Sequence, residues 1–226
     1  MDWIHRYQLF LFDFDGLLVN TEELHFAAYI EMCRARGFTL PWNFNEFCLA
    51  AHYDSTGLRE AIYKEFPALL AQEPNWDVLY KEKKTAYLQL LKENRLQLME
   101  GVEELLIALD RAGIRRCVAT NSFLEQIEEI KKALPVLKTI PLWITRENYT
   151  RQKPDPDAYL TALKHLAQPR DAIIGFEDTL RGVKALLGAR VQPVLICPTG
   201  HPQLKDPALQ DVPTFRSFKE IPAAGP

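Results

Sequence analysis

The chain has 226 residues, of which 47% are hydrophobic and 25% charged, a composition typical of a folded globular protein. The formal net charge is only -3 and the basic residues form no cluster, which argues against a nucleic-acid partner and an anionic membrane surface. No segment approaches the roughly 18 consecutive apolar residues of a membrane span, and the N-terminus MDWIHRYQ lacks the apolar region of a signal peptide. We therefore expect a soluble, cytoplasmic protein with one main domain and a smaller insertion.

The first predicted element is a strand over residues 8–14, with the sequence QLFLFDF. Such a continuous apolar run is typical of a strand that is buried on both faces of a parallel sheet. Asp13 and Asp15 stand at its end, separated by one aromatic residue. Because buried carboxylates are costly without compensation, the pattern predicts that a cation or a hydrogen-bond network lies next to them.

A helix is expected to follow directly. Asn20 and Glu23 have the spacing of a capping box, in which the first side chain caps the helix and the second reaches back to it. The helix is expected to end near Gly37. Its apolar face would consist of Phe26, Tyr29, Ile30 and Cys33.

Further helical patterns cover residues 56–66 and 76–91, and no convincing strand interrupts them. We therefore expect a helical domain over residues 21–95, inserted after the first strand. The aromatic residues of this segment are expected to pack its core rather than to contact a substrate; they are Trp42, Phe44, Phe47 and Tyr53.

From residue 96 onward, strands alternate with helices. Strands are predicted over residues 115–120, 142–145, 172–176 and 193–197. Helices are predicted over residues 101–112, 124–134 and 179–189, the first with Gly113 as its C-cap. A further helix is predicted to begin after Asp155 as N-cap, with Pro156 as its first residue. This alternation predicts an α/β fold with a doubly wound parallel sheet, formed by residues 1–20 and 96–226.

The four cysteines, Cys33, Cys48, Cys117 and Cys197, are far apart in the sequence and form no CxxC pair. They therefore give no sign of a structural zinc site. In a cytoplasmic chain we expect them to be reduced and buried.

Polar side chains follow the expected strands at their carboxyl ends, which is where open parallel sheets bind ligands. Asp13 and Asp15 follow the first strand, Thr120, Asn121 and Ser122 follow the second, and Glu177 and Asp178 follow the fourth. Lys153 precedes the helix after the third strand.

The chemistry of this set suits phosphoryl transfer. Carboxylates from two strand ends can hold one Mg²⁺ ion, and a hydroxyl and an ammonium group suit the oxygens of a phosphoryl group. A carboxylate can also act as the nucleophile, and a second one nearby can move the proton.

Four segments carry a family resemblance. In order along the chain, DFDGLLVNTE, VATNS, QKPDPDAY and GFEDTLRG are similar to the four motifs of the haloacid-dehalogenase-like superfamily. The chain resembles in particular its phosphatase and β-phosphoglucomutase-like branch, which has a Rossmann-like core and a helical cap after the first motif. The resemblance implies that Asp13 is the nucleophile, Asp15 the general acid and base, and Thr120 and Lys153 ligands of the phosphoryl oxygens.

The resemblance also implies a Mg²⁺ cofactor. Asp13, Asp178 and the backbone carbonyl of Asp15 would hold the ion, with Glu177 acting directly or through a water molecule. The substrate contacts that it implies are Gly16, His25, Asn121 and Ser122.

Two departures from the family pattern are present. Asn20 stands where the family usually has Asp, and the segment CLAAHYDSTGLREA lacks an obvious KG or RG pair at the expected place. It offers His52, Tyr53, Asp54 and, later, Arg59 instead, which argues against a diphosphorylated sugar as substrate.

These observations predict a Mg²⁺-dependent phosphomonoester hydrolase that acts on a small phosphorylated metabolite through an aspartyl-phosphate intermediate, as a monomer or weak homodimer. One alternative is a sugar-phosphate mutase that uses the same Asp13, favoured by the stretch NTEELH. The other is a non-enzymatic binding protein with a retired site, against which the intact set of carboxylates counts.

Overall fold

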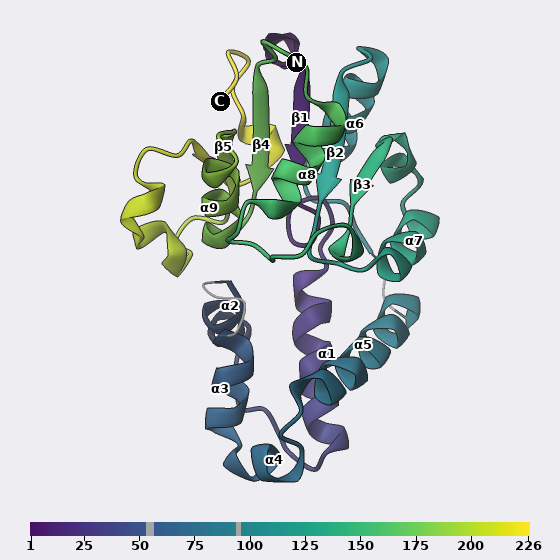
Figure 1. Ribbon diagram of the computed structural model, residues 1–226, viewed down its shortest axis with the longest axis vertical. Coiled ribbons are helices and arrows are strands. Elements are labelled where there is room, and N and C mark those ends of the chain that lie inside the picture. The colour runs from purple at the N-terminus through teal and green to yellow at the C-terminus, as the bar shows by residue number, and fades with distance from the viewer. Residues whose placement is uncertain (53–56, 94–95) are drawn as a thin grey trace. The chain divides into compact units, whose positions relative to one another are not determined.

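The computed structural model describes residues 1–52, 57–93 and 96–226 (Figure 1). The chain divides into two compact units. The first, here called the core unit, consists of Met1–Asn20 and Gln97–Pro226, and the second, the helical unit, consists of Thr21–Leu96.

The core unit contains a six-stranded sheet in the order β3-β2-β1-β4-β5-β6. The strands are β1 (Leu9–Phe12), β2 (Arg115–Ala119), β3 (Leu142–Ile144), β4 (Ile173–Glu177), β5 (Gln192–Ile196) and β6 (Thr214–Phe215). Every neighbouring pair is parallel, and Leu11 at the centre pairs with Cys117 on one side and Gly175 on the other. The predicted doubly wound parallel sheet is therefore confirmed, with strand ends at most two residues from those expected, and β6 is a short additional strand near the C-terminus.

The central strand is buried on both faces, as its uninterrupted apolar sequence requires. On one face Phe10 and Phe12 stack with Phe176 of β4 at ring-centroid distances of 6.1 and 5.5 Å. On the other face Leu9 and Leu11 pack into an apolar cluster with α8 and α9.

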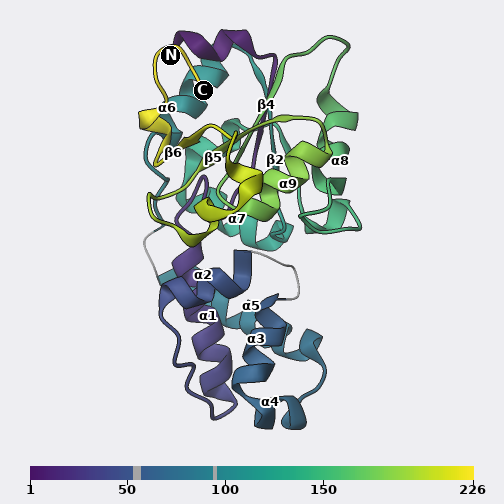
Figure 2. The same ribbon diagram turned by 90° about the vertical axis from the view of Figure 1, so that its left-hand side faces the viewer.

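Helices cover both faces of the sheet. The core unit contains α6 (Val102–Arg111), α7 (Leu124–Ala133), α8 (Asp157–Leu166) and α9 (Leu180–Gly188). Its short 3₁₀ helices are η1 (Asp2–Arg6), η2 (Pro135–Thr139), η3 (Arg146–Asn148), η4 (Pro202–Lys205), η5 (Pro207–Leu209) and η6 (Phe218–Glu220). Figure 2 shows α8 and α9 on one side of the strands and α6 on the other.

The start of α8 differs by one residue from the prediction. Pro156 is the N-cap and Asp157 the first helical residue, although Asp155 still accepts a hydrogen bond from the Asp157 N–H, at 3.0 Å. After α6 the C-cap is Ala112 rather than the predicted Gly113, which follows it with a φ of 63°.

The helical unit contains α1 (Glu22–Ala35), α2 (Phe44–His52), α3 (Gly57–Glu65), α4 (Pro67–Gln72) and α5 (Trp76–Glu93). Its core includes Phe47, with Trp42 and Phe44 packed against it. The expected core residue Tyr53 lies outside the described residues.

The capping-box prediction for Asn20 is wrong. The N-cap of α1 is Thr21, and the Asn20 side chain instead accepts a hydrogen bond from the Gln97 N–H, at 2.8 Å. The Asn20 N–H also donates to the Gln97 carbonyl oxygen, at 3.1 Å. The chain leaves the core unit at Asn20 and re-enters it at Gln97, directly beside Asn20. The Asn20 side chain therefore bonds to the Gln97 backbone instead of capping α1.

The cysteine prediction is confirmed, because all four cysteines are buried and free. Within the described part of the chain, no helix combines the length and the apolar character that a membrane crossing needs.

Candidate active site

The carboxyl end of β1 places two carboxylates at the edge of the sheet. The Asp13 N–H still donates to the Phe176 carbonyl oxygen, at 3.0 Å, so the pairing with β4 continues one residue past the strand. Gly16 then takes a φ of 77° and donates its N–H to the Val19 carbonyl oxygen, at 2.9 Å. This turn, which a glycine adopts without strain, lets the chain reverse directly after Asp15.

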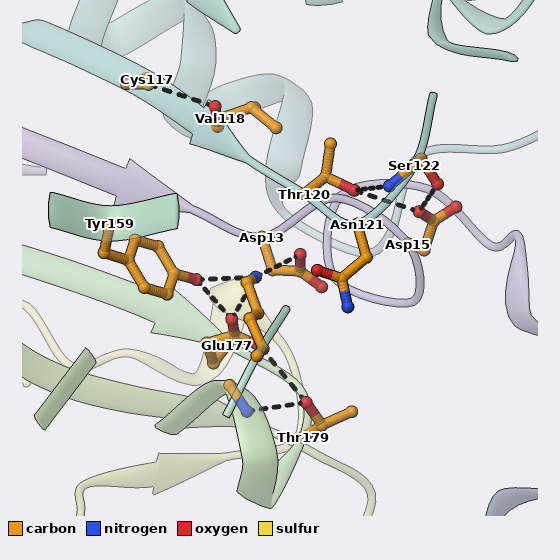
Figure 3. A network of polar contacts seen from close by, with 12 residues as sticks. Asp13, Asp15, Cys117, Val118, Thr120, Asn121, Ser122, Tyr159, Glu177 and Thr179 are labelled. Atoms are coloured by element: carbon orange, nitrogen blue, oxygen red, sulfur yellow. Dashed lines mark hydrogen bonds and ion pairs between the residues drawn. The ribbon is translucent and has the colours of Figure 1, made fainter. Parts of the chain in front are cut away.

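Asp13 and Glu177, from two strand ends, lie close together (Figure 3), and Lys153 joins their carboxylates. Its Nζ donates to Asp13 Oδ1 at 2.7 Å and to Glu177 Oε1 at 2.6 Å. The Lys153 side chain is 3% exposed and that of Glu177 is fully buried, whereas Asp13 is 14% exposed. The buried ammonium group therefore fixes the Asp13 carboxylate at the accessible side of the site.

The charges of Asp13, Lys153 and Glu177 act on one another at hydrogen-bond distance. Burial and the charge of Glu177 raise the pKa of Asp13 to about 7, although Lys153 offsets part of the rise. Burial alone would lower the pKa of Lys153, but the charges and hydrogen bonds of Asp13 and Glu177 together raise it above its usual value. Lys153 is therefore a permanent cation, and further positive charge beside Asp13 would favour its ionised, nucleophilic form.

Tyr159 of α8 completes the group and was not predicted. Its hydroxyl donates to Glu177 Oε1 and accepts from Lys153 Nζ, the latter at 3.0 Å. Burial and the charge of Glu177 raise the pKa of Tyr159 well above its usual value, so the hydroxyl keeps its proton. The apolar periodicity of α8 places Tyr159 in the core; the only signal of a further role is that a buried phenol needs a hydrogen-bond partner.

A glycine of α9 makes room for Glu177, and it too was not predicted. A Cβ atom at Gly182 would lie 1.9 Å from the Glu177 carboxylate carbon. The Gly182 N–H donates to Thr179 Oγ1, at 3.2 Å, which caps the helix. The first turn of α9 can therefore sit directly against the buried carboxylate, and the glycine in GFEDTLRG is the signal that could have shown it.

Asp178 adds a third carboxylate beside Asp13 and Glu177. One oxygen from each of these three residues lies within 4.8 Å of the others. Hard oxygen ligands of this kind are the ones that Mg²⁺ takes in proteins. The donor set therefore fits magnesium.

A second polar group surrounds Asp15. Its Oδ2 accepts hydrogen bonds from the Ser122 hydroxyl and, at 3.4 Å, from the Thr120 hydroxyl. The Ser122 N–H donates to Thr120 Oγ1 at 2.9 Å, which ties the two hydroxyl residues together. Asn121 lies beside them, and its Oδ1 accepts from the Tyr149 hydroxyl.

His25 belongs to the helical unit. Its ring stacks on Tyr87 with centroids 4.2 Å apart, and Lys83 Nζ lies 2.6 Å from its Nδ1. Lys83 is 3% exposed and its ammonium group also lies 5.0 Å from the centre of the Tyr29 ring. His25 is thus held within a buried group of aromatic rings around a lysine.

The other candidate residues of the helical unit are only partly described. His52 ends α2, but its side chain, Tyr53 and Asp54 lie outside the described residues. Arg59 of α3 is exposed and, with Trp76 and neighbouring residues, lines a cavity of about 380 Å³.

Comparison with known proteins identifies the family. The family of haloacid dehalogenase-like hydrolases matches residues 10–196 of the chain. The chain is 32% identical to the protein CbbY of Cereibacter sphaeroides over 188 residues, which cover 79% of each chain. It is 28% identical to a phosphorylated carbohydrates phosphatase of Thermotoga maritima over 189 residues, which cover 80% of this chain and 81% of that one.

A solved structure supports the same assignment. The crystal structure of CbbY from Rhodobacter sphaeroides in complex with xylulose-(1,5)-bisphosphate superimposes with a TM-score of 0.72 at 26% identity, covering 95% of this chain and 96% of that one.

The parallel sheet and the carboxylates at its edge thus define an α/β protein whose candidate site is suited to phosphoryl transfer. The chain belongs to the haloacid dehalogenase-like hydrolases, and it is a phosphatase of that family. The predicted family and enzyme class are confirmed.

Proposed function

We propose that the protein is a Mg²⁺-dependent phosphomonoester hydrolase that forms an aspartyl-phosphate on Asp13. The observation that supports this most directly is the Asp13 carboxylate, held through Oδ1 by the buried Lys153 ammonium group at 2.7 Å and left partly accessible. A carboxylate fixed in this way can act as a nucleophile without a search for the right orientation.

In the first step, an oxygen of Asp13 attacks the phosphorus atom and the bond between phosphorus and the ester oxygen breaks. Asp15 gives its proton to that oxygen, so the product leaves as a neutral alcohol. The hydrogen bonds from Thr120 and Ser122 hold the Asp15 carboxyl group in place for this transfer.

In the second step, Asp15 takes a proton from a water molecule that attacks the same phosphorus atom. The bond between phosphorus and Asp13 breaks, which releases phosphate and restores the free carboxylate. Lys153 stays charged throughout and offsets the negative charge shared by Asp13 and the phosphoryl group. Thr120, Asn121, Ser122 and the Gly16 turn are proposed to contact the phosphoryl oxygens.

Mg²⁺ would be held by Asp13, Asp178 and the carbonyl oxygen of Asp15. When bound, the ion supplies positive charge that offsets the repulsion between Asp13 and a phosphate. Glu177 would act through a water molecule, because its Oε1 already accepts from Lys153 and Tyr159.

For the substrate we propose a small phosphorylated carbohydrate. The support is the similarity to a phosphorylated carbohydrates phosphatase and to CbbY, whose structure holds xylulose-(1,5)-bisphosphate. We further propose that the helical unit serves as a cap that contributes His25 to the substrate site.

The test is phosphate release from a panel of small phosphomonoesters, measured with Mg²⁺ and with EDTA. The panel includes phosphorylated pentoses and hexoses and β-glucose 1-phosphate, with formation of glucose 6-phosphate followed in parallel. Metal-dependent release that disappears in Asp13→Asn supports the proposal. Asp211→Asn, an exposed carboxylate outside the site, is the matched control and should keep full activity.

Two outcomes would overturn the proposal. Isomerised sugar phosphate with little free phosphate would identify a mutase. No turnover of any panel member together with no Mg²⁺ binding would identify a binding protein.

A further inference from the structure

Gln203 is a buried polar residue far along the chain from the four motifs. It lies in η4, after β5, and is 1% exposed. Two of the residues that it contacts, Leu180 and Cys197, belong to a buried apolar cluster against which the next residue, Leu204, also packs. A primary amide in such a place is stable only when its donors and acceptor are satisfied.

The side-chain amide of Gln203 makes three hydrogen bonds. Its Oε1 accepts from the Leu180 N–H at 2.8 Å, and its Nε2 donates to the Asp178 carbonyl oxygen at 2.7 Å. The second Nε2 proton is directed to Cys197 Sγ, at 3.1 Å. The reversed amide orientation would place an NH₂ group against the Leu180 N–H, so these partners determine the orientation.

The two backbone partners lie on either side of Thr179. The Leu180 N–H belongs to the first turn of α9, where no helix carbonyl is available to accept it. The Asp178 carbonyl group lies between the end of β4 and the start of α9, outside both elements. One side chain from 25 residues away along the chain therefore holds the backbone of the turn that carries the Asp178 carboxylate.

We propose that Gln203 is a positioning residue for Asp178 and thereby sets the affinity of the site for Mg²⁺. This proposal rests on the proposed function, in which Asp178 is a magnesium ligand. Gln203 itself touches neither the ion nor the substrate. Partners that orient metal ligands from outside the coordination sphere typically contribute about 10- to 100-fold to metal affinity.

The test uses Gln203→Met in the full-length protein. Methionine has nearly the same length and suits a place beside an apolar cluster, but it can neither accept from Leu180 nor donate to Asp178. Mg²⁺ binding is measured by isothermal titration calorimetry without substrate, and we expect the dissociation constant to rise about 10- to 100-fold. In parallel, the Mg²⁺ concentration that gives half-maximal phosphate release should rise similarly, while kcat at saturating Mg²⁺ stays close to that of the wild type.

Val194→Ala is the matched control for lost stability. Val194 is fully buried in β5 and belongs to no part of the proposed site. Its truncation should lower the melting temperature and leave the Mg²⁺ dissociation constant unchanged.

Each outcome decides the question. Unchanged Mg²⁺ affinity in Gln203→Met, with wild-type binding intact, would overturn this proposal alone. No Mg²⁺ binding by the wild type would overturn both this proposal and the proposed function. If Gln203→Met does not fold, Gln203→Asn keeps the amide but withdraws it from its partners, and an unchanged affinity in that variant would also overturn the proposal.

Discussion

The Lys153 ammonium group has three oxygen neighbours, and only two of them are carboxylates. The third, the Tyr159 hydroxyl, bonds both Lys153 and Glu177 inside the core unit. Lys153 and Glu177 are both charged and buried, whereas the Tyr159 hydroxyl is neutral. The hydroxyl therefore fixes the positions of the two charged groups and adds no charge of its own.

Tyr159→Phe removes this hydroxyl and keeps the ring. Since a hydrogen bond to a charged group contributes about 1.5–3 kcal/mol, we expect the free energy of unfolding to fall by about that amount. Urea unfolding at neutral pH measures the change. Tyr7→Phe, whose hydroxyl donates over the longer distance of 3.4 Å to Gln192, is the matched control and should lose less. An equal or smaller loss in Tyr159→Phe would contradict the role given to its hydroxyl.

At this scale, the sequence could predict which side chains gather but not what supports them. Asp13, Glu177 and Asp178 lie together because they stand at the carboxyl ends of two neighbouring parallel strands, β1 and β4. Tyr159 and Gln203 depend on how α8 and the tail pack, and neither has a distinctive local pattern. The roles of the gathered residues stay predictions until they are tested.

At the scale of elements, the strands and most helices could be predicted because buried parallel strands and amphipathic helices have distinct patterns of apolar residues in the sequence. The first and last residues of each helix and strand are harder to predict. Asn20 is an example, because a capping box and a contact to a distant backbone use the same side-chain oxygen. Only the return of the chain at Gln97 decides between them.

Asn20→Ala tests that contact. It removes the acceptor of the Gln97 N–H, and since Asn20 is exposed we expect a loss of about 0.5–1.5 kcal/mol in the free energy of unfolding. Asn20→Asp keeps an acceptor oxygen and should stay within about 0.5 kcal/mol of the wild type. Thermal and urea unfolding of both variants measure the difference; equal losses in the two would contradict the contact.

The loop before β4 is joined to the start of β2 by an ion pair. Arg115 donates to Asp171 Oδ1 at 2.6 Å, and the Gln168 N–H donates to Asp171 Oδ2 at 2.6 Å. The hydrogen bond from Arg115 is the main reason why the pKa of Asp171 lies below its usual value; burial opposes it, and the Gln168 hydrogen bond and the Arg115 charge add to the lowering. The native state thus favours the charged carboxylate more than the unfolded chain does.

This shift gives a pH dependence with a definite sign. The stabilisation is fully present above the ordinary aspartate pKa of about 3.9 and is lost as the pH falls through the lowered value in the folded protein. We therefore expect Asp171→Asn to lower the free energy of unfolding by up to about 1 kcal/mol at pH 7. The difference from the wild type should shrink below about pH 4. Urea unfolding at a series of pH values measures it, with Asp211→Asn as control, and a difference that grows on acidification would contradict the argument.

At the scale of the whole molecule, the core unit is interrupted in sequence but closed in structure. Val19 bridges Leu98 in antiparallel fashion, and Asn20 and Gln97 hydrogen-bond each other at the next position. The chain therefore leaves and re-enters the core unit at adjacent points, which a short hairpin turn can join. The helical unit, Thr21–Leu96, has its own buried core built from α1 to α5 and adjoining loops.

We expect a chain in which residues 21–96 are replaced by Asn-Gly to fold as the core unit alone. Because its strands, α6 to α9 and the carboxylate group are all retained, it should unfold in one cooperative transition and still bind Mg²⁺. Without the proposed cap, which would order the substrate and exclude water, phosphate release from phosphorylated sugars should fall by a factor on the order of 100. Circular dichroism during urea unfolding and calorimetric Mg²⁺ titration measure the first two expectations, and the phosphate assay measures the third.

The same deletion combined with Asn20→Ala removes the side-chain hydrogen bond between Asn20 and Gln97 and should lower the free energy of unfolding of the shortened chain. Full activity of the shortened chain would contradict the cap, and failure to unfold cooperatively would contradict the independence of the core unit.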